Sequence, residues 1–136
     1  MAVDDGAHLA LYNDREEVLL QHRSKHARRF PDHWGLFGGR IEKGETPEQA
    51  LAREIFEELE YKVKAPVLVV KQKTAWNDIR RFEYVFAEKY DASQSLVQHE
   101  GQEMIWRRFD NLDNLLVADY VREELLKVAR YIGSVI

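Results

Sequence analysis

The segment that most constrains the fold begins at Thr46 and carries a complete start signal for an α-helix. Thr46 can serve as the N-cap, Pro47 suits the first helical position, and Gln49 can close a capping box. Apolar residues then recur at helical spacing, and they define one face: Leu51, Ala52, Ile55, Phe56 and Leu59. This pattern predicts an amphipathic helix that packs on a core.

The adjoining face of this helix carries three carboxylates, Glu54, Glu57 and Glu58, within an arc about a quarter-turn wide. Most acidic helix faces are simply solvated, and that interpretation stands beside a functional one. Two costs favour function, because Glu54 and Glu58 repel each other at i, i+4 and the helix dipole disfavours carboxylates in its second half. A divalent cation would remove both costs, and carboxylate oxygens suit Mg²⁺, with Mn²⁺ also compatible.

Further segments have the composition of β-strands and lie on both sides of this helix in the chain. The predicted strands are Ala7–Tyr12, Val18–Arg23, Val67–Lys73, Phe82–Tyr90 and Met104–Phe109, with a short apolar piece at Trp34–Phe37. A last amphipathic helix is predicted from about Tyr120. Because strands and helices do not alternate one for one, we expect an α/β (α+β) fold with a mixed β-sheet between helices. Residues 1–136 contain no linker or repeat, which predicts a single domain.

Composition restricts the class of protein and its compartment. The 136 residues carry a formal net charge of −4, which disfavours a general nucleic-acid binder. The apolar runs are too short to cross a membrane, and the N-terminus lacks the basic and apolar regions of a signal peptide. The chain has no cysteine, which excludes thiolate chemistry and leads us to expect a cytoplasmic protein.

One segment departs from the acidic average. Basic and histidine side chains gather in it: His22, Arg23, Lys25, His26, Arg28, Arg29 and His33. A solvated loop is the ordinary interpretation of such a run, and attraction of a phosphate-bearing substrate is the functional one. Trp34 and Trp76 leave a similar choice open, since each could stack on a nucleobase or belong to the core.

The spacing of charged residues around the first helix resembles the Nudix box. Gly39 is followed after five residues by Glu45, and after seven more by Arg53-Glu54-Ile55-Phe56-Glu57-Glu58. The resemblance covers Gly39–Tyr61. It implies a Nudix-type α/β/α sandwich in which the box forms a loop, a helix and a second loop.

Two positions depart from the family pattern, which has a glycine followed by an aliphatic residue where this chain has Glu60 and Tyr61. That glycine suits a residue in the left-handed conformation just past the helix. The resemblance therefore predicts a left-handed backbone at Glu60, at a cost of about 1 kcal/mol for a residue with a side chain.

The resemblance also implies a role for each charged residue of the box. The expected metal ligands are the carbonyl of Gly39 and the carboxylates Glu54, Glu57, Glu58 and Glu100. The expected catalytic residues are Arg53, Glu54 and Glu57. Arg53 would orient Glu54, Glu45 would brace the loop against Arg53, and the identity of the general base stays open among the glutamates.

Three residues outside the box extend the predicted site. Glu100 begins a Glu-Gly-Gln stretch, followed by Trp106, that resembles the source of a further metal carboxylate in MutT-like members. The backbone freedom of Gly101 would let Glu100 swing toward the helix. Arg23 matches an arginine that approaches substrate phosphates, with a solvated strand end as the alternative. Asp119 stands where some relatives read the base, with a plain N-cap as the alternative.

These assignments predict Mg²⁺-dependent hydrolysis of the diphosphate linkage in a nucleoside diphosphate derivative. The leading hypothesis is a nucleoside triphosphate pyrophosphohydrolase that releases a nucleoside monophosphate and pyrophosphate. The alternative substrates are a nucleotide sugar, a dinucleotide, or capped or triphosphorylated RNA. A hypothesis of another class is a non-catalytic regulatory module, and the intact Arg53 and its carboxylates argue against it. We expect the protein to bind a small nucleotide and not to associate with a membrane. A homodimer is compatible with the sequence.

Overall fold

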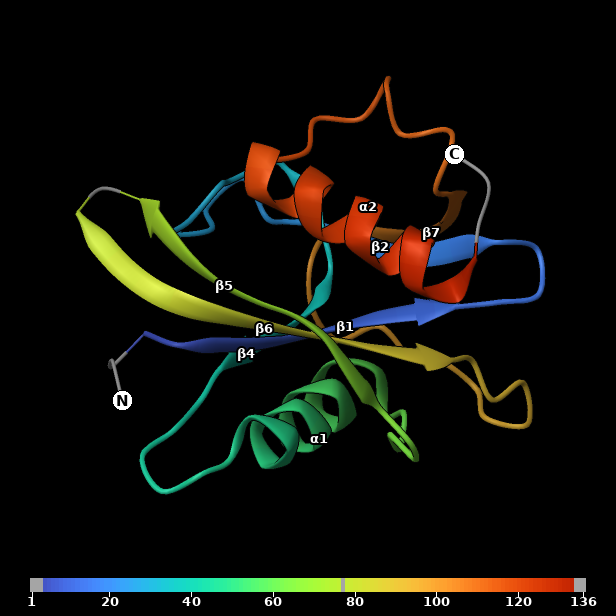
Figure 1. The fold of residues 1–136 in the computed structure, drawn as a ribbon, viewed down its shortest axis with the longest axis horizontal. Helices are drawn as coiled ribbons and strands as arrows, with labels where there is room; N and C mark the ends of the chain where they lie inside the picture. The colour runs from blue at the N-terminus through green and yellow to red at the C-terminus, as the bar shows by residue number, and fades with distance from the viewer. Residues whose placement is uncertain (1–3, 77, 134–136) are drawn as a thin grey trace.

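The computed structural model describes residues 4–76 and 78–133, which form one mixed β-sheet with a helix on each face (Figure 1). The strands are β1 (Gly6–Tyr12), β2 (Glu17–His22), β3 (Trp34–Gly35), β4 (Phe37–Arg40), β5 (Val67–Trp76), β6 (Ile79–Lys89) and β7 (Glu103–Arg108). The helices are α1 (Pro47–Leu59) and α2 (Asp119–Ile132). The predicted sandwich with a mixed sheet between helices is confirmed.

The sheet is mixed because β1 runs parallel to β6 and antiparallel to β2 and β4. Its main path has the order β3-β2-β1-β6-β5, while β4 pairs with β1 and β7 pairs with β2. The β5–β6 hairpin extends far beyond the other strands, at the left of Figure 1. Strand β4, which leads into α1, therefore lies beside β1, and β1 in turn lies beside β6.

Each face of the sheet has its own apolar core. On one face α1 packs on strand residues in a cluster that includes Leu9, Phe37, Leu51, Ile55, Leu59 and Phe86. On the other face α2 packs in a cluster that includes Ala10, Leu20, Val85, Val121, Leu125 and Val128. Neighbours in one strand, such as Leu9 and Ala10, belong to different clusters because successive side chains of a strand point to opposite faces.

Helix α1 begins and ends as the sequence predicts. The hydroxyl of Thr46 accepts a hydrogen bond from the Gln49 N–H at 3.1 Å, and the Gln49 side chain accepts one from the Thr46 N–H at 2.9 Å. Glu60 is left-handed, with φ at 54°, and its N–H donates to the Phe56 carbonyl at 2.9 Å. The capping box and the left-handed residue are confirmed. Neither helix among the described residues is long and apolar enough to cross a membrane.

Most strand limits differ from the prediction by one residue, and they differ more at two places. The β5–β6 ladder continues to the pair Trp76 and Ile79, beyond the predicted Val67–Lys73 and Phe82–Tyr90, because cross-strand pairing extends over charged residues. The predicted piece Trp34–Phe37 is two strands, since β3 pairs with β2 and β4 pairs with β1. The side chain of Trp76, a predicted stacking residue, lies outside the described part of the structure.

Candidate active site

Two glycines of β4 allow α1 to approach the strand closely. A Cβ on Gly39 would lie 2.5 Å from the carboxylate of Glu54, so a larger residue would displace that carboxylate. Gly38 has a φ of 146°, and its N–H donates a hydrogen bond to Glu58 Oε1 at 2.9 Å. Glycine at these positions therefore lets both glutamates reach the strand.

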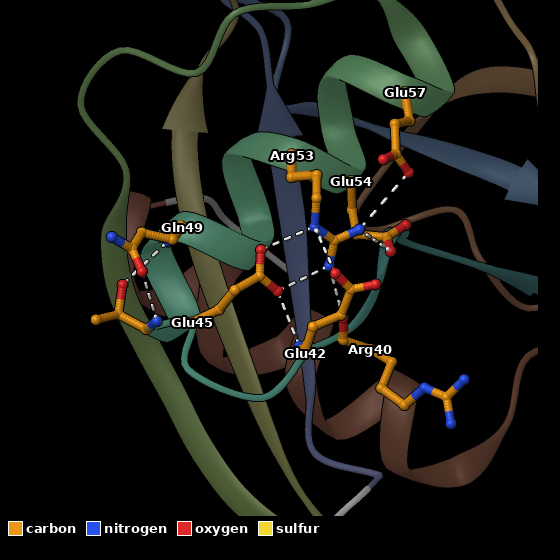
Figure 2. A network of polar contacts seen from close by, with 8 residues as sticks. Arg40, Glu42, Glu45, Gln49, Arg53, Glu54 and Glu57 are labelled. Atoms are coloured by element: carbon orange, nitrogen blue, oxygen red, sulfur yellow. Dashed lines mark hydrogen bonds and ion pairs between the residues drawn. The ribbon is translucent and has the colours of Figure 1, made fainter.

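Arg53 lies at the centre of a polar network between α1 and the loop before it (Figure 2). Its Nε and Nη2 donate to the two carboxylate oxygens of Glu45 at 2.8 and 2.9 Å, and its Nη1 donates to Glu54 Oε1 at 2.8 Å. Nη2 also donates to the carbonyl of Arg40 at 3.0 Å. The hydrogen bonds from Arg53 lower the pKa of Glu45 to about 2. Arg53 thereby ties the loop to the carboxylate of Glu54.

The segment before β7 is fastened to the end of α1. The N–H of Val97 donates to the carbonyl of Leu59 at 3.0 Å, and the N–H of His99 donates to the carbonyl of Glu58 at 2.8 Å. Glu100 follows at once, and its side chain lies within hydrogen-bonding reach of the Glu58 carboxyl group. A residue far along the chain thus joins the carboxylates of the helix.

The backbone turns at Gly101, whose φ is 81°, a value that favours glycine. Glu100 lines the same cavity as Glu54 and Glu58. Glu103 instead begins β7 and is exposed. The structure therefore brings together Glu54, Glu58 and Glu100, and the role of Glu100 as a metal ligand stays a prediction.

Glu58 is the deeply buried member of this group, with 3% of its surface exposed. Burial, with the neighbouring Glu100 and Glu54, raises the pKa of Glu58 to about 10. This set of hard oxygen donors fits a divalent cation, which would offset the repulsion among them. Among the described residues, no three histidine, aspartate or glutamate side chains are grouped closely enough to hold a metal ion as they stand.

Glu57 shares the helix face but not the cavity. Its side chain is 58% exposed, against 17% for Glu54, and it lies 3.6 Å from Arg53 Nη1 (Figure 2). It is not among the described residues that line the cavity. The three glutamates lie on one face of α1, as predicted. The sheet buries Glu58, however, and leaves Glu57 exposed at the edge of the site.

The acidic group forms one end of a cavity of about 220 Å³. Its other end is lined by Arg29 of the basic segment and by polar side chains that sequence reasoning missed: His8, Arg81, Glu83, Tyr120 and Glu124. The alternation of side chains between the two faces of β6 could have predicted two of these residues, Arg81 and Glu83. Tyr84 packs in the α1 cluster, so its neighbour Glu83 must face the other side of the sheet.

The basic segment after β2 divides between the cavity and solvent. Arg23 and Arg29 both line the cavity, and Arg23 Nε donates to the carbonyl of Arg29 at 3.0 Å. Lys25, His26 and Arg28 are exposed. A wholly solvated loop is therefore a wrong description of this segment, because its two partly buried arginines face the cavity.

Two further predicted residues lie in different surroundings. Trp34 lines the cavity and stacks on His22 with ring centroids 4.5 Å apart. Asp119 is the first residue of α2, is exposed, and lies outside the described residues that line the cavity. Its interpretation as an N-cap is wrong, because in the described chain Ala118 holds that position without a side-chain capping bond.

A family model described as the NUDIX domain matches residues 4–129. The chain belongs to the Nudix family. This Nudix domain is 34% identical over 113 residues to the NAD-capped RNA hydrolase NudC of Shigella dysenteriae, a match that covers 82% of this chain and 42% of that protein. The chain thus spans less than half the length of the curated relatives that it matches.

Solved structures share the fold of this Nudix domain. The MutT protein from Methanosarcina mazei Go1 superposes with a TM-score of 0.84 at 20% identity, covering 98% of this chain and 97% of that one. The NUDIX domain of Shewanella oneidensis NrtR, crystallised with ADP ribose, gives 0.79 at 17% identity and covers 97% and 90%. Nudix hydrolases use divalent metal ions, in agreement with the donor set of this site.

Proposed function

We propose that this Nudix protein hydrolyses the diphosphate linkage of nucleoside triphosphates with Mg²⁺ and releases a nucleoside monophosphate and pyrophosphate. The observation that carries the proposal is the convergence of Glu54, Glu58 and Glu100 at one end of a cavity. A diphosphate is crowded with negative charge and repels an attacking water. A site that gathers carboxylates around a divalent cation is suited to overcome this barrier.

Glu54, Glu58 and Glu100 would hold the metal with the carbonyl of Gly39, and the bound ion would neutralise the diphosphate and lower the pKa of a bound water. Arg53 keeps the Glu54 carboxylate oriented through its hydrogen bond at 2.8 Å. A glutamate of the group would take the proton of the water, with Glu54 in contact with the site and Glu57 at its rim.

The cavity of about 220 Å³ is smaller than the roughly 300–1,000 Å³ of a typical small-molecule site, so it encloses only part of a nucleotide. Arg23, which lines the cavity beside the acidic group, would contact the phosphates.

Capped RNA is the second candidate substrate. The similarity to NudC, named as an NAD-capped RNA hydrolase, motivates it. A second hollow next to Glu100 is lined by Arg23, His26 and Arg28, which could follow an RNA backbone. A purely regulatory module has no need for the network of Arg53, and this argues against the third hypothesis.

The deciding experiment incubates the protein with Mg²⁺ and one compound at a time: the nucleoside triphosphates, NAD, ADP-ribose, and NAD-capped RNA. Products are separated and scored for monophosphate, pyrophosphate and phosphate. We expect a triphosphate to give a monophosphate and pyrophosphate at the highest kcat/KM. Faster release of the cap from RNA would replace the proposed substrate, and binding without turnover of any compound would favour the regulatory module.

A further inference from the structure

The end of the cavity away from the acidic group holds a buried charge cluster that the proposed mechanism does not use. Arg81 forms an ion pair with Glu83, and His8 Nδ1 lies 3.1 Å from the same carboxylate. Arg29 Nη1 lies 3.8 Å from it. Glu83 is 1% exposed, and burial alone would raise its pKa, but His8 and Arg81 outweigh burial and lower the pKa to about 2. Glu83 is therefore a charged group that holds its neighbours in place.

Helix α2 adds a second buried carboxyl group, Glu124, to this end of the cavity. Its surface is 3% exposed, and its Oε2 accepts a hydrogen bond from Gln72 Nε2 at 2.9 Å. Burial and the nearby Glu83 raise the pKa of Glu124 to about 8. The next residue before it on the helix, Glu123, is exposed. The hydrogen bond from Gln72, a residue of β5, thus holds the Glu124 side chain at the cavity wall.

The cluster is connected to the acidic end through Gly38. The ring of His8 packs against Gly38, where a Cβ would come within 2.8 Å of His8 Cδ2. Gly38 in turn donates its N–H to Glu58. A ligand whose diphosphate lies at Glu58 would therefore extend its next group toward Glu83 and its partners.

Buried ionisable groups are costly, and apolar side chains of similar size could fill such a space without that cost. Ionisable groups with shifted pKa values that line a cleft are candidates for function. Two arginines alone would suit a second phosphate. Here the carboxylate of Glu83 already pairs with Arg81 and lies 3.8 Å from Arg29 Nη1, which leaves less positive charge for a further anion.

We propose that Arg81 and Glu124 read the nucleobase of the substrate, and that Glu83 and His8 position Arg81 for this task. A guanidinium offers only donors, and a carboxyl group offers an acceptor, together with a donor when it is protonated. The edge of a nucleobase carries donors and acceptors side by side, which matches this pair. Tyr120 lines the same cavity and can cover the face of the ring. The base reader is thus Glu124 on α2, in place of the exposed Asp119.

This inference rests on the proposed function for the position of the diphosphate, so its test measures binding without turnover. The dissociation constants of AMP, GMP, CMP and UMP are measured by calorimetry with Mg²⁺ for the unaltered protein. Glu124→Leu and Arg81→Lys are the test variants, and Glu123→Leu on the same helix is the matched control. Arg81→Lys keeps the charge but loses the planar fork of donors.

We expect the unaltered protein to prefer one base over another by at least about tenfold, as a site that hydrogen-bonds its ligand does. Glu124→Leu and Arg81→Lys should reduce that ratio by about tenfold, and Glu123→Leu should preserve it. Circular dichroism shows whether each variant folds. If one variant fails to fold, the other still tests the inference.

Equal affinity of the unaltered protein for all four monophosphates would overturn the inference. So would an unchanged ratio in a folded Glu124→Leu or Arg81→Lys variant. Base-selective binding without hydrolysis would reject the proposed function and leave the base site standing. Hydrolysis that does not depend on the base would reject the base site and leave the proposed function standing.

Discussion

The carboxylate of Glu54 occupies the space where a side chain at Gly39 would lie. A Cβ built on Gly39 falls 2.5 Å from both the carboxylate carbon and Oε2 of Glu54. The same carboxylate is held from its other side by Arg53 at 2.8 Å. The strand, the helix and the arginine therefore leave Glu54 little room, which fixes the direction in which it faces the cavity.

Gly39→Ala should lower kcat at least tenfold, because the new methyl group must push Glu54 out of the cavity; a misplaced catalytic group commonly costs on the order of a hundredfold. It should also lower the free energy of unfolding by about 1–3 kcal/mol through overpacking. Urea unfolding and Mg²⁺-dependent hydrolysis measure the two effects. Gly35→Ala is the control for stability, since a Cβ there meets no described atom within 4 Å. Equal stability and activity of Gly39→Ala would contradict the close packing.

Removal of the metal should abolish hydrolysis, and Glu54→Gln should lower kcat at least about a hundredfold, the size of a single metal-ligand or general-base effect. Glu57→Gln should lower kcat by the same order, because Glu57 lies beside Arg53 and would act there as metal ligand or base. Activity is measured with Mg²⁺ and with EDTA. Glu48→Gln, in the first turn of α1, is the control for loss of one negative charge. Full activity in EDTA, or in folded Glu54→Gln, would reject the mechanism.

Glu100→Gln should lower kcat at saturating Mg²⁺, whereas Glu103→Gln should have little effect. The reason is position, because Glu100 reaches Glu58 in the cavity and Glu103 is an exposed residue of β7. Titration of activity against Mg²⁺ should show a weaker apparent affinity for the ion in Glu100→Gln. A damaging Glu103→Gln beside a silent Glu100→Gln would reverse the assignment.

Glu60→Gly should leave catalysis intact and raise the free energy of unfolding by up to about 1 kcal/mol, because glycine adopts the left-handed backbone at Glu60 without a steric penalty. The change also removes a contact with His99 Nε2 at 2.5 Å, so Glu60→Ala serves as the control that loses this contact alone. Urea unfolding compares the three proteins. Glu60→Gly less stable than Glu60→Ala would contradict the prediction.

Stability should fall as the pH rises from about 5 to 8 through Glu124. Its pKa is about 8 in the folded protein, against an ordinary value of 4.5, so between these values the folded state binds the extra proton. The free energy of unfolding therefore decreases with pH, by at most about 1.4 kcal/mol per pH unit for one proton. Glu124→Gln should flatten this slope, and exposed Glu123→Gln should keep it. Thermal unfolding across this range measures both, and equal slopes in all three proteins would contradict the prediction.

Sequence alone determined the features of this protein that depend on near neighbours. The capping box of Thr46 and Gln49, the acidic arc around Glu54 and the left-handed Glu60 each involve residues within one or two helical turns. Their geometry follows from backbone hydrogen bonding and the helical repeat, which are local. For the same reason, the alternation of residues along each strand predicted which apolar side chains face the core. It did not predict where each strand ends.

Tertiary structure decided which of these residues share a site. Glu57 and Glu58 are adjacent in the sequence, yet the sheet covers Glu58 and leaves Glu57 exposed. The cluster of His8, Glu83 and Glu124 joins a strand, a second strand and a helix that are far apart in the chain. Burial and charge pairing there arise from long-range packing, which no local pattern encodes, and they turn ordinary polar residues into a candidate recognition site.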